Sequence, residues 1–234
     1  MKKFLIHSLA VCMAALAFVA CNDDNDELTD KRVTYYPTVI LEGDDYIVLD
    51  KGSVYEEPGY YAEMQGEDAT AEVEVKSNLN MNKSGVYSIT YSLTNVDGFS
   101  SVQERTIVVL DPNDPVEGFY LSSPNSYREY QGEVPYGAVF EILVLNNGDG
   151  TYSVDDLLGG WYCQRAGYGY AYAMEGIISI DDNGAISLVD SYVPGWGDSA
   201  EDLEGVYDAT TNTLTWAVTY TDYPFIFHVI LNKE

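Results

Sequence analysis

Cysteine is scarce in this sequence, with only Cys12, Cys21 and Cys163 among 234 residues. Cys12 and Cys21 lie in or just after an apolar N-terminal run, so Cys163 stands alone in the rest of the chain. An intramolecular disulfide framework is therefore excluded, and the stability of the fold must come from buried apolar cores.

Basic residues and histidines are also few. Lys and Arg total 11 against 38 Asp and Glu, which gives a net charge of −27. Such a surface repels phosphates and anionic lipid headgroups, so we expect no nucleic-acid partner and no membrane contact through the protein surface. Beyond residue 20 the only histidine is His228, and its apolar neighbours favour a structural role over a base. One His and one Cys cannot form a zinc site.

Long apolar runs are absent except for residues 9–20, which follow Lys2 and Lys3. This segment has the length of a secretory signal and is too short to span a bilayer. Its end, Ala20-Cys21, resembles the lipobox of bacterial lipoproteins, although Phe18 replaces the usual leucine. The acidic residues 22–27 resemble the export signal of Bacteroidota surface lipoproteins. The resemblance implies a signal peptide over residues 1–20, an acidic tether over residues 21–30, and an outer-membrane anchor through a lipid on Cys21. Removal of Lys2 and Lys3 with the signal peptide gives the mature chain a net charge of (11 − 2) − 38 = −29.

Residues 31–110 alternate in the period of β-strands and contain no helical pattern, which predicts an antiparallel β-sandwich of about seven strands. Four motifs occur in order along this segment: residues 52–59, 85–91, 97–100 and 105–109. This series resembles the bacterial immunoglobulin-like surface domains related to the HYR module. The resemblance implies a spacer or interaction module without catalytic residues, in which Tyr87 forms a tyrosine corner. Residues 111–117 hold two prolines and three carboxylates, and we interpret them as a stiff linker.

Residues 118–234 are also predicted to be all-β, with Asn, Asp and Gly turns between consecutive strands. The strand candidates are 118–122, 138–145, 150–154, 160–165, 168–174, 176–180, 185–188, 204–208, 213–220 and 225–231. Successive hairpins predict an antiparallel meander that closes into a β-barrel or packs as a sandwich. Residues 157–162, 167–169, 193–198 and 207–216 resemble an uncharacterised C-terminal domain of Bacteroidota surface lipoproteins.

Two acidic turns, 146–150 and 181–184, hold oxygen ligands for calcium, but neither continues to the glutamate of an EF-hand loop. Hairpin turn chemistry explains both of them. No pair of carboxylates is marked as a glycosidase site. We therefore expect no metal, no cofactor and no catalytic residue.

The aromatic residues of the second half are the main functional lead. In residues 168–174 strand alternation places Tyr168, Tyr170 and Tyr172 on one face, where their rings form a platform for stacking on sugars. Trp161, Tyr162 and Trp196 extend this platform. The alternative is that the tyrosines pack inside the barrel, as aromatic strand residues normally do. Trp216 alternates like a core residue.

These features predict a surface-anchored, non-catalytic lipoprotein that binds or handles a glycan, with the first domain as stalk and the second as working head. One alternative is a structural or adhesive envelope protein whose head binds another protein. A second alternative is a barrel that carries a small apolar ligand in its lumen. An enzyme is the least supported class.

Overall fold

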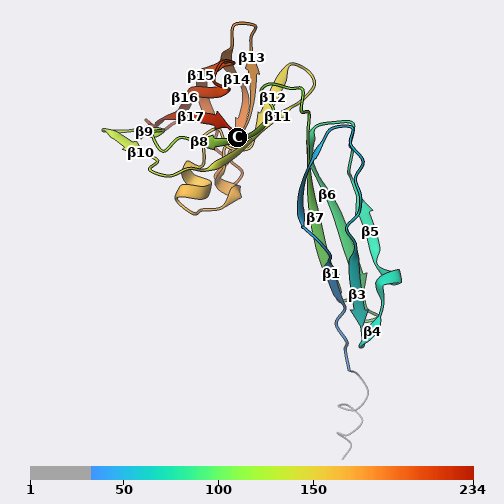
Figure 1. Cartoon of the computed structure of the whole chain (residues 1–234). Helices are drawn as coiled ribbons and strands as arrows, with labels where there is room; N and C mark the ends of the chain where they lie inside the picture. Colours follow the sequence, from blue (N-terminus) through green and yellow to red (C-terminus); the bar gives the residue numbers. More distant parts are fainter. Residues whose placement is uncertain (1–32) are drawn as a thin grey trace, which may run out of the picture.

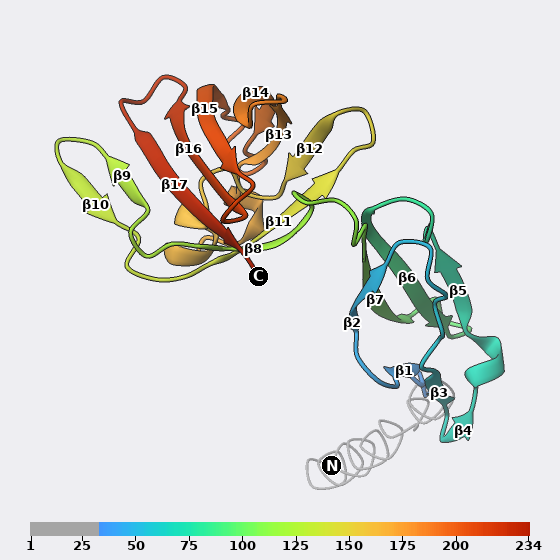
Figure 2. The ribbon, with the colours of Figure 1, turned by 45° about the horizontal axis from the view of Figure 1, so that its top comes forward.

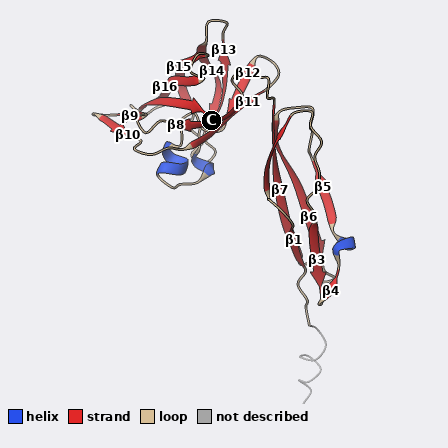
Figure 3. Ribbon diagram, in the orientation of Figure 1, coloured by secondary structure: helices blue, strands red, loops and turns tan. Residues whose placement is uncertain are grey.

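The computed structural model describes residues 33–234, which form two successive β-domains (Figure 1). The predicted signal peptide, the tether and Cys21 lie outside the described residues. No helix within residues 33–234 combines the length and apolarity needed to cross a membrane. Helical turns are short and occur in two places, after β4 and between β12 and β13 (Figure 3).

The first domain is a sandwich of two sheets. One sheet has the order β1 (Thr38–Leu41), β3 (Tyr60–Met64), β4 (Glu67–Asp68). The other has the order β2 (Tyr46–Asp50), β7 (Ser100–Leu110), β6 (Gly85–Thr94), β5 (Glu74–Ser77), and the short helix η1 (Thr70–Glu72) precedes β5. The predicted antiparallel arrangement is wrong for one pair, because β2 runs parallel to β7. The turn at Gly43 carries the chain from one sheet to the other and does not form a hairpin.

A buried charge links the immunoglobulin-like motifs inside this domain. The Arg105 side chain on β7 is 0% exposed, and its Nη1 lies 3.1 Å from Glu57 Oε1. Tyr55 and Tyr91 both donate hydrogen bonds to the same carboxylate. The predicted tyrosine corner is confirmed, because the Tyr87 hydroxyl donates to the Lys83 carbonyl at 2.8 Å. The segment 52–59 is thus fixed against β7 by ion pairing.

The second domain is a closed antiparallel barrel of eight strands (Figure 2). The strands, in order around the barrel, are β8 (Gly118–Ser122), β11 (Glu141–Asn146), β12 (Thr151–Val154), β13 (Glu175–Ile180), β14 (Ala185–Tyr192), β15 (Ala200–Asp208), β16 (Thr213–Tyr220) and β17 (Ile226–Lys233). β17 pairs with β8 and closes the barrel, and it also pairs with β9 (Tyr127–Glu129) of a hairpin completed by β10 (Glu133–Pro135). The sequence indicated neither β9 nor β10.

Two predicted strands are wrong. Residues 160–165 contain the π-helical turn η2 (Trp161–Arg165), and residues 168–174 contain the 3₁₀ turn η3 (Tyr170–Tyr172). Gly159 and Gly160 have φ of 58° and 88°, which turns the chain away from an extended path just before η2. The predicted alternation of three tyrosines along one strand face therefore does not occur.

The barrel interior is filled by side chains. On β16 the residues Leu214, Trp216, Val218 and Tyr220 all point inward, which confirms the core position of Trp216. Leu157 and Leu158, from the long connection between β12 and β13, join the same core and are 0% exposed. The hypothesis of an apolar ligand in the lumen required a hollow barrel, and this packing contradicts it.

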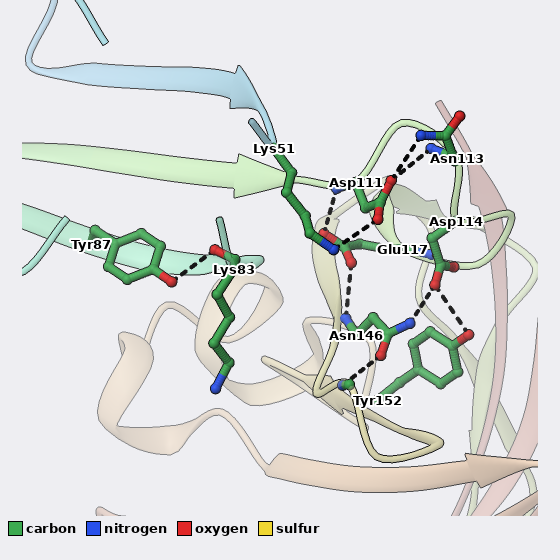
Figure 4. Close-up of polar contacts among 10 residues, drawn as sticks. Lys51, Lys83, Tyr87, Asp111, Asn113, Asp114, Glu117, Asn146 and Tyr152 are labelled. Carbon is green, nitrogen blue, oxygen red and sulfur yellow. Dashed lines mark hydrogen bonds and ion pairs between the residues drawn. The ribbon is translucent and has the colours of Figure 1, made fainter. Parts of the chain in front are cut away.

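The junction between the domains is built from polar contacts (Figure 4). Lys51 Nζ lies 2.9 Å from Asp111 Oδ2. Glu117, only 3% exposed, accepts the Asp111 backbone N–H at 3.0 Å and the Asn146 backbone N–H at 3.2 Å. Burial raises the pKa of Glu117. The segment 111–117 is thereby held both to the end of β2 and to the barrel strand β11.

Candidate functional site

The site begins with a buried carboxylate that shapes the connection between β12 and β13. Asp156 is 2% exposed and accepts the backbone N–H groups of Leu158, Gly160 and Met174 at 2.9, 3.0 and 3.1 Å. Burial raises its pKa to about 7, although the three donors favour the charged form. The two ends of the connection are thus tied together, and the residues between them are presented at one end of the barrel.

A second loop, between β14 and β15, presents Trp196. Val193 is 0% exposed, and its carbonyl accepts the N–H groups of Trp196 and Gly197 at 3.2 and 2.8 Å. Only glycine fits at position 195, because the backbone there lies against the Tyr172 ring and a Cβ would be 2.5 Å from that ring. Its N–H donates to the Ala171 carbonyl at 2.6 Å. The two loops therefore meet at Gly195.

Four of the six predicted binding residues lie together where these loops meet. Trp196 contacts the rings of Tyr162, Tyr172 and Tyr168, with centroid distances of 4.8, 4.8 and 6.1 Å. Tyr162 and Tyr168 stack at 6.2 Å with 17° between their planes. Tyr168 is 55% exposed and Trp196 is 41% exposed. We call Tyr162, Tyr168, Tyr172 and Trp196 the aromatic cluster.

The other two predicted residues lie elsewhere. Trp161 is 4% exposed and packs against Tyr136 and Phe227, so the prediction that it belongs to an exposed platform is wrong. Its ring is covered by the guanidinium groups of Arg165 and Arg128, at 4.1 and 5.0 Å. Tyr170 is 73% exposed, but it faces the first domain and has no ring contact with the aromatic cluster.

Polar groups border the aromatic cluster. Burial raises the pKa of the Tyr162 hydroxyl, and a hydrogen bond and charge from Arg128 partly offset that rise. Asp198 follows the Trp196 turn, and its Oδ2 accepts a hydrogen bond from the Tyr220 hydroxyl at 3.2 Å. The cluster thus combines ring faces with a guanidinium and a carboxylate. Asp198 lies two residues from Trp196 in the sequence, and that proximity is the signal that could have indicated it.

Aromatic side chains continue from this cluster toward the β9–β10 hairpin. Tyr223 stacks on Phe225 at 5.7 Å, and Tyr130 packs edge-on against the same ring at 5.0 Å. Tyr130 and Tyr223 are 38% and 51% exposed. The sequence predicted a strand from Phe225, but it indicated neither the β9–β10 hairpin that carries Tyr130 nor the contact of these rings, which depends on tertiary packing.

The remaining candidates are explained by local structure. His228 stacks on Tyr127 at 4.3 Å and lies 3.1 Å from Glu129, as suits a structural histidine. Cys163 is buried, which raises the pKa of its thiol to about 12. In the turn 181–184, Asp181 accepts two backbone N–H groups at 2.8 Å. Across residues 33–234, no three His, Cys, Asp or Glu side chains are arranged to hold a metal ion.

Comparison with known proteins identifies both domains. Residues 39–109 match the family described as a bacterial surface protein, Ig-like domain, and residues 110–233 match a family described as a C-terminal domain. The architecture is thus that of a bacterial surface protein with an Ig-like domain followed by a β-barrel. The crystal structure of the lipoprotein BT2262 from Bacteroides thetaiotaomicron is 39% identical, with a TM-score of 0.68, and the match covers 85% of this chain and 100% of that one. The chain belongs to the family of this lipoprotein.

Weaker similarities involve ZmpB of Clostridium perfringens. The catalytic domain with the CBM51-1 and CBM51-2 domains is 13% identical, with 85% of this chain and 21% of that chain covered and a TM-score of 0.28. The structure of CBM51-2 in complex with GlcNAc and INT domains is 15% identical, with 84% and 43% covered and a TM-score of 0.27. Scores this low support no conclusion about fold or ligand. No curated protein matches the chain.

Proposed function

We propose that this protein is a non-catalytic, glycan-binding surface lipoprotein whose binding site is the aromatic cluster. The observation that supports it most is the meeting of Tyr162, Tyr168, Tyr172 and Trp196 from two loops at one exposed place. Solvent-exposed rings present flat apolar faces that stack on pyranose rings, while tyrosine hydroxyls and nearby charged groups bond sugar hydroxyls. In this proposal Cys21 carries the lipid, the anchor lies in the outer membrane, and the Ig-like domain extends the barrel from it.

The proposal predicts that loss of one exposed ring weakens glycan binding. We would screen the protein against a panel of soluble polysaccharides by affinity electrophoresis and measure the best binder by calorimetry. Trp196→Ala and Tyr168→Ala should each raise Kd about tenfold, which corresponds to about 1.4 kcal/mol. Tyr61→Ala is the matched control, because Tyr61 is an exposed tyrosine, at 39%, on the Ig-like domain. Equal affinity in all four proteins would refute the assignment of the site.

A second candidate function is adhesion to another envelope protein. Two further exposed tyrosines, Tyr130 and Tyr223, pack on the partly buried Phe225 and favour it, since protein interfaces are enriched in tyrosine and poor in lysine. In this case no polysaccharide binds, and a single envelope protein co-purifies in a fixed ratio with the natural chain but not with Tyr223→Ala. The two readouts therefore separate the candidates.

A further inference from the structure

An open groove of about 550 Å³ lies between the Ig-like domain and the outer wall of the barrel. It is distinct from the aromatic cluster, and both domains line it. Its volume falls within the range of ligand-binding pockets. Nothing in the proposed glycan function uses this groove, so its chemistry is a separate question.

The floor of the groove is the outer face of β11, β12, β13 and β14. One row of paired residues runs across it as Leu145, Ser153, Ile177 and Asp190, each opposite the next. These side chains point outward because their strand neighbours, such as Val144 and Ile178, point into the core. The row is therefore apolar at the β11 end and ends in a carboxylate on β14.

A second row lies beside the first and has the same mixed character. Leu143 is followed by Asp155, whose backbone N–H donates to the Leu143 carbonyl at 3.1 Å, and Glu175 pairs with Tyr192 on β14. Burial raises the pKa of Asp155 to about 6, and the charge of Glu141 contributes to this rise. Three carboxylates, from Asp155, Glu175 and Asp190, thus line the groove, and none of the described lining residues is Lys, Arg or His.

The opposite wall comes from the Ig-like domain. Val86 lines the groove and is 51% exposed, and it shares a row with Val108 and Val48 on the outer face of the sheet. Tyr46 lies near Glu141 and Asp155, whose charges add to the rise in its pKa caused by burial. Val86 is the one residue of the Ig-like domain among the described lining residues, so the charge of the groove comes from the barrel.

We propose that this interdomain groove docks an extended basic segment of a partner polypeptide. Its ammonium or guanidinium groups lie against Asp155, Glu175 and Asp190, and its aliphatic side chains lie against Leu145, Ile177 and Val86. The charge of the groove excludes an acidic partner, and a second copy of this chain, with a net charge of −27, is repelled.

The spacing of the carboxylates favours a peptide over a single small amine. Asp155, beyond β12, and Asp190, on β14, are separated by two strand spacings, about 10 Å, across the sheet and by two residues, about 7 Å, along it. Alternate side chains of an extended peptide lie about 7 Å apart on one face, and flexible lysine side chains span the difference. A single amine reaches the carboxylate at one end of the groove only, whereas a peptide with alternating basic and aliphatic residues reaches the carboxylates at both ends.

The test uses acetyl-Leu-Lys-Leu-Lys-Leu-Lys-amide as the probe, with calorimetry at low and at physiological salt. We expect binding that weakens with salt, and an increase in Kd of about two- to fivefold for Asp190→Asn, which removes one carboxylate from the open groove. Asp182→Asn is the matched control, since Asp182 is an exposed carboxylate on the adjacent hairpin outside the groove. Both positions are exposed, so both variants should fold, and thermal unfolding verifies this.

Three outcomes would overturn the proposal. The first is an equal loss of peptide affinity in Asp190→Asn and Asp182→Asn. The second is undiminished binding of a peptide that has Glu in place of Lys. The third is binding of spermidine as tight as that of the hexapeptide. The first two indicate unspecific association and the third indicates a small organic cation. Trp196→Ala should leave peptide binding unchanged, so failure of this proposal is separable from failure of the glycan proposal.

Discussion

At the scale of single residues, Asp156 fixes the conformation of the connection between β12 and β13. Its carboxylate organises a connection of nearly twenty residues through three backbone donors, and it does so from a position without solvent. A group of this kind couples the folding of the loop to pH. Because the aromatic cluster is mounted on this connection, the same coupling extends to the proposed binding site.

The sign of this coupling follows from the raised pKa of Asp156. Asp156 titrates near pH 4 when unfolded and at about 7 when folded, so its contribution to stability is complete below about pH 4 and is lost as pH rises through about 7. We expect the free energy of unfolding of the natural protein minus that of Asp156→Asn to fall as pH rises from 4 to 7, by up to about 1.4 kcal/mol per pH unit. Thermal unfolding of both proteins at each pH, monitored by circular dichroism, measures this difference in stability.

Asp181 supplies the control for this experiment. Two backbone N–H groups lower the pKa of Asp181, so its contribution is present above about pH 4 and is lost only at lower pH. The Tm difference between the natural protein and Asp181→Asn should therefore stay flat from pH 5 to 7. A flat profile for Asp156→Asn as well would show that the buried carboxylate is charged throughout this range.

At the scale of elements, the contact between η3 and the β14–β15 loop holds the aromatic cluster together. Gly195→Ala places a Cβ 2.5 Å from the Tyr172 ring and 2.8 Å from the Ala171 carbonyl. We expect the two loops to separate, with a loss of about 1 to 3 kcal/mol of stability. The near-ultraviolet circular dichroism of the coupled rings should weaken while the far-ultraviolet spectrum of the barrel stays unchanged.

Gly197→Ala distinguishes steric displacement from backbone strain in that experiment. Gly197 has φ of 75° in the same loop, and a Cβ there meets nothing within 4 Å. The substitution should cost about 1 to 2 kcal/mol through strain alone and keep the aromatic signal. If both variants lose the signal equally, close packing at Gly195 is not what positions Tyr172.

Sequence patterns predicted best the strands in which apolar and polar residues alternate along the chain. The strand at 213–220 was predicted with its exact bounds, because every second residue is apolar and turn residues flank it. Residues 168–174 also alternate, yet Asp156 and Gly195 fold them into a turn through contacts distant in sequence. Trp196 was predicted to extend the tyrosine platform, whereas the contacts it makes with three tyrosine rings depend on tertiary packing.

At the scale of the molecule, the polar junction sets the relation between the two domains. Glu117 joins the linker to β11 while Lys51 joins the linker to the Ig-like domain, so the groove keeps its width only if both contacts persist. In Glu117→Gln, the amide N–H₂ cannot accept both backbone donors, and one of them is left unpaired. The cost of one buried unpaired donor is about 1 to 3 kcal/mol, enough to free the domains without unfolding either.

We therefore expect Glu117→Gln to widen the distribution of interdomain distances, measured by spin labels on the two domains, and to weaken binding of the basic hexapeptide. Glu74→Gln is the matched control: it also removes one carboxylate, from an ion pair with Lys76 whose side chains are 62% and 71% exposed. Surface pairs of this kind contribute almost nothing, so its distance distribution should equal that of the natural protein. An unchanged distribution in Glu117→Gln would mean that apolar contacts along the groove, and not the polar junction, fix the two domains.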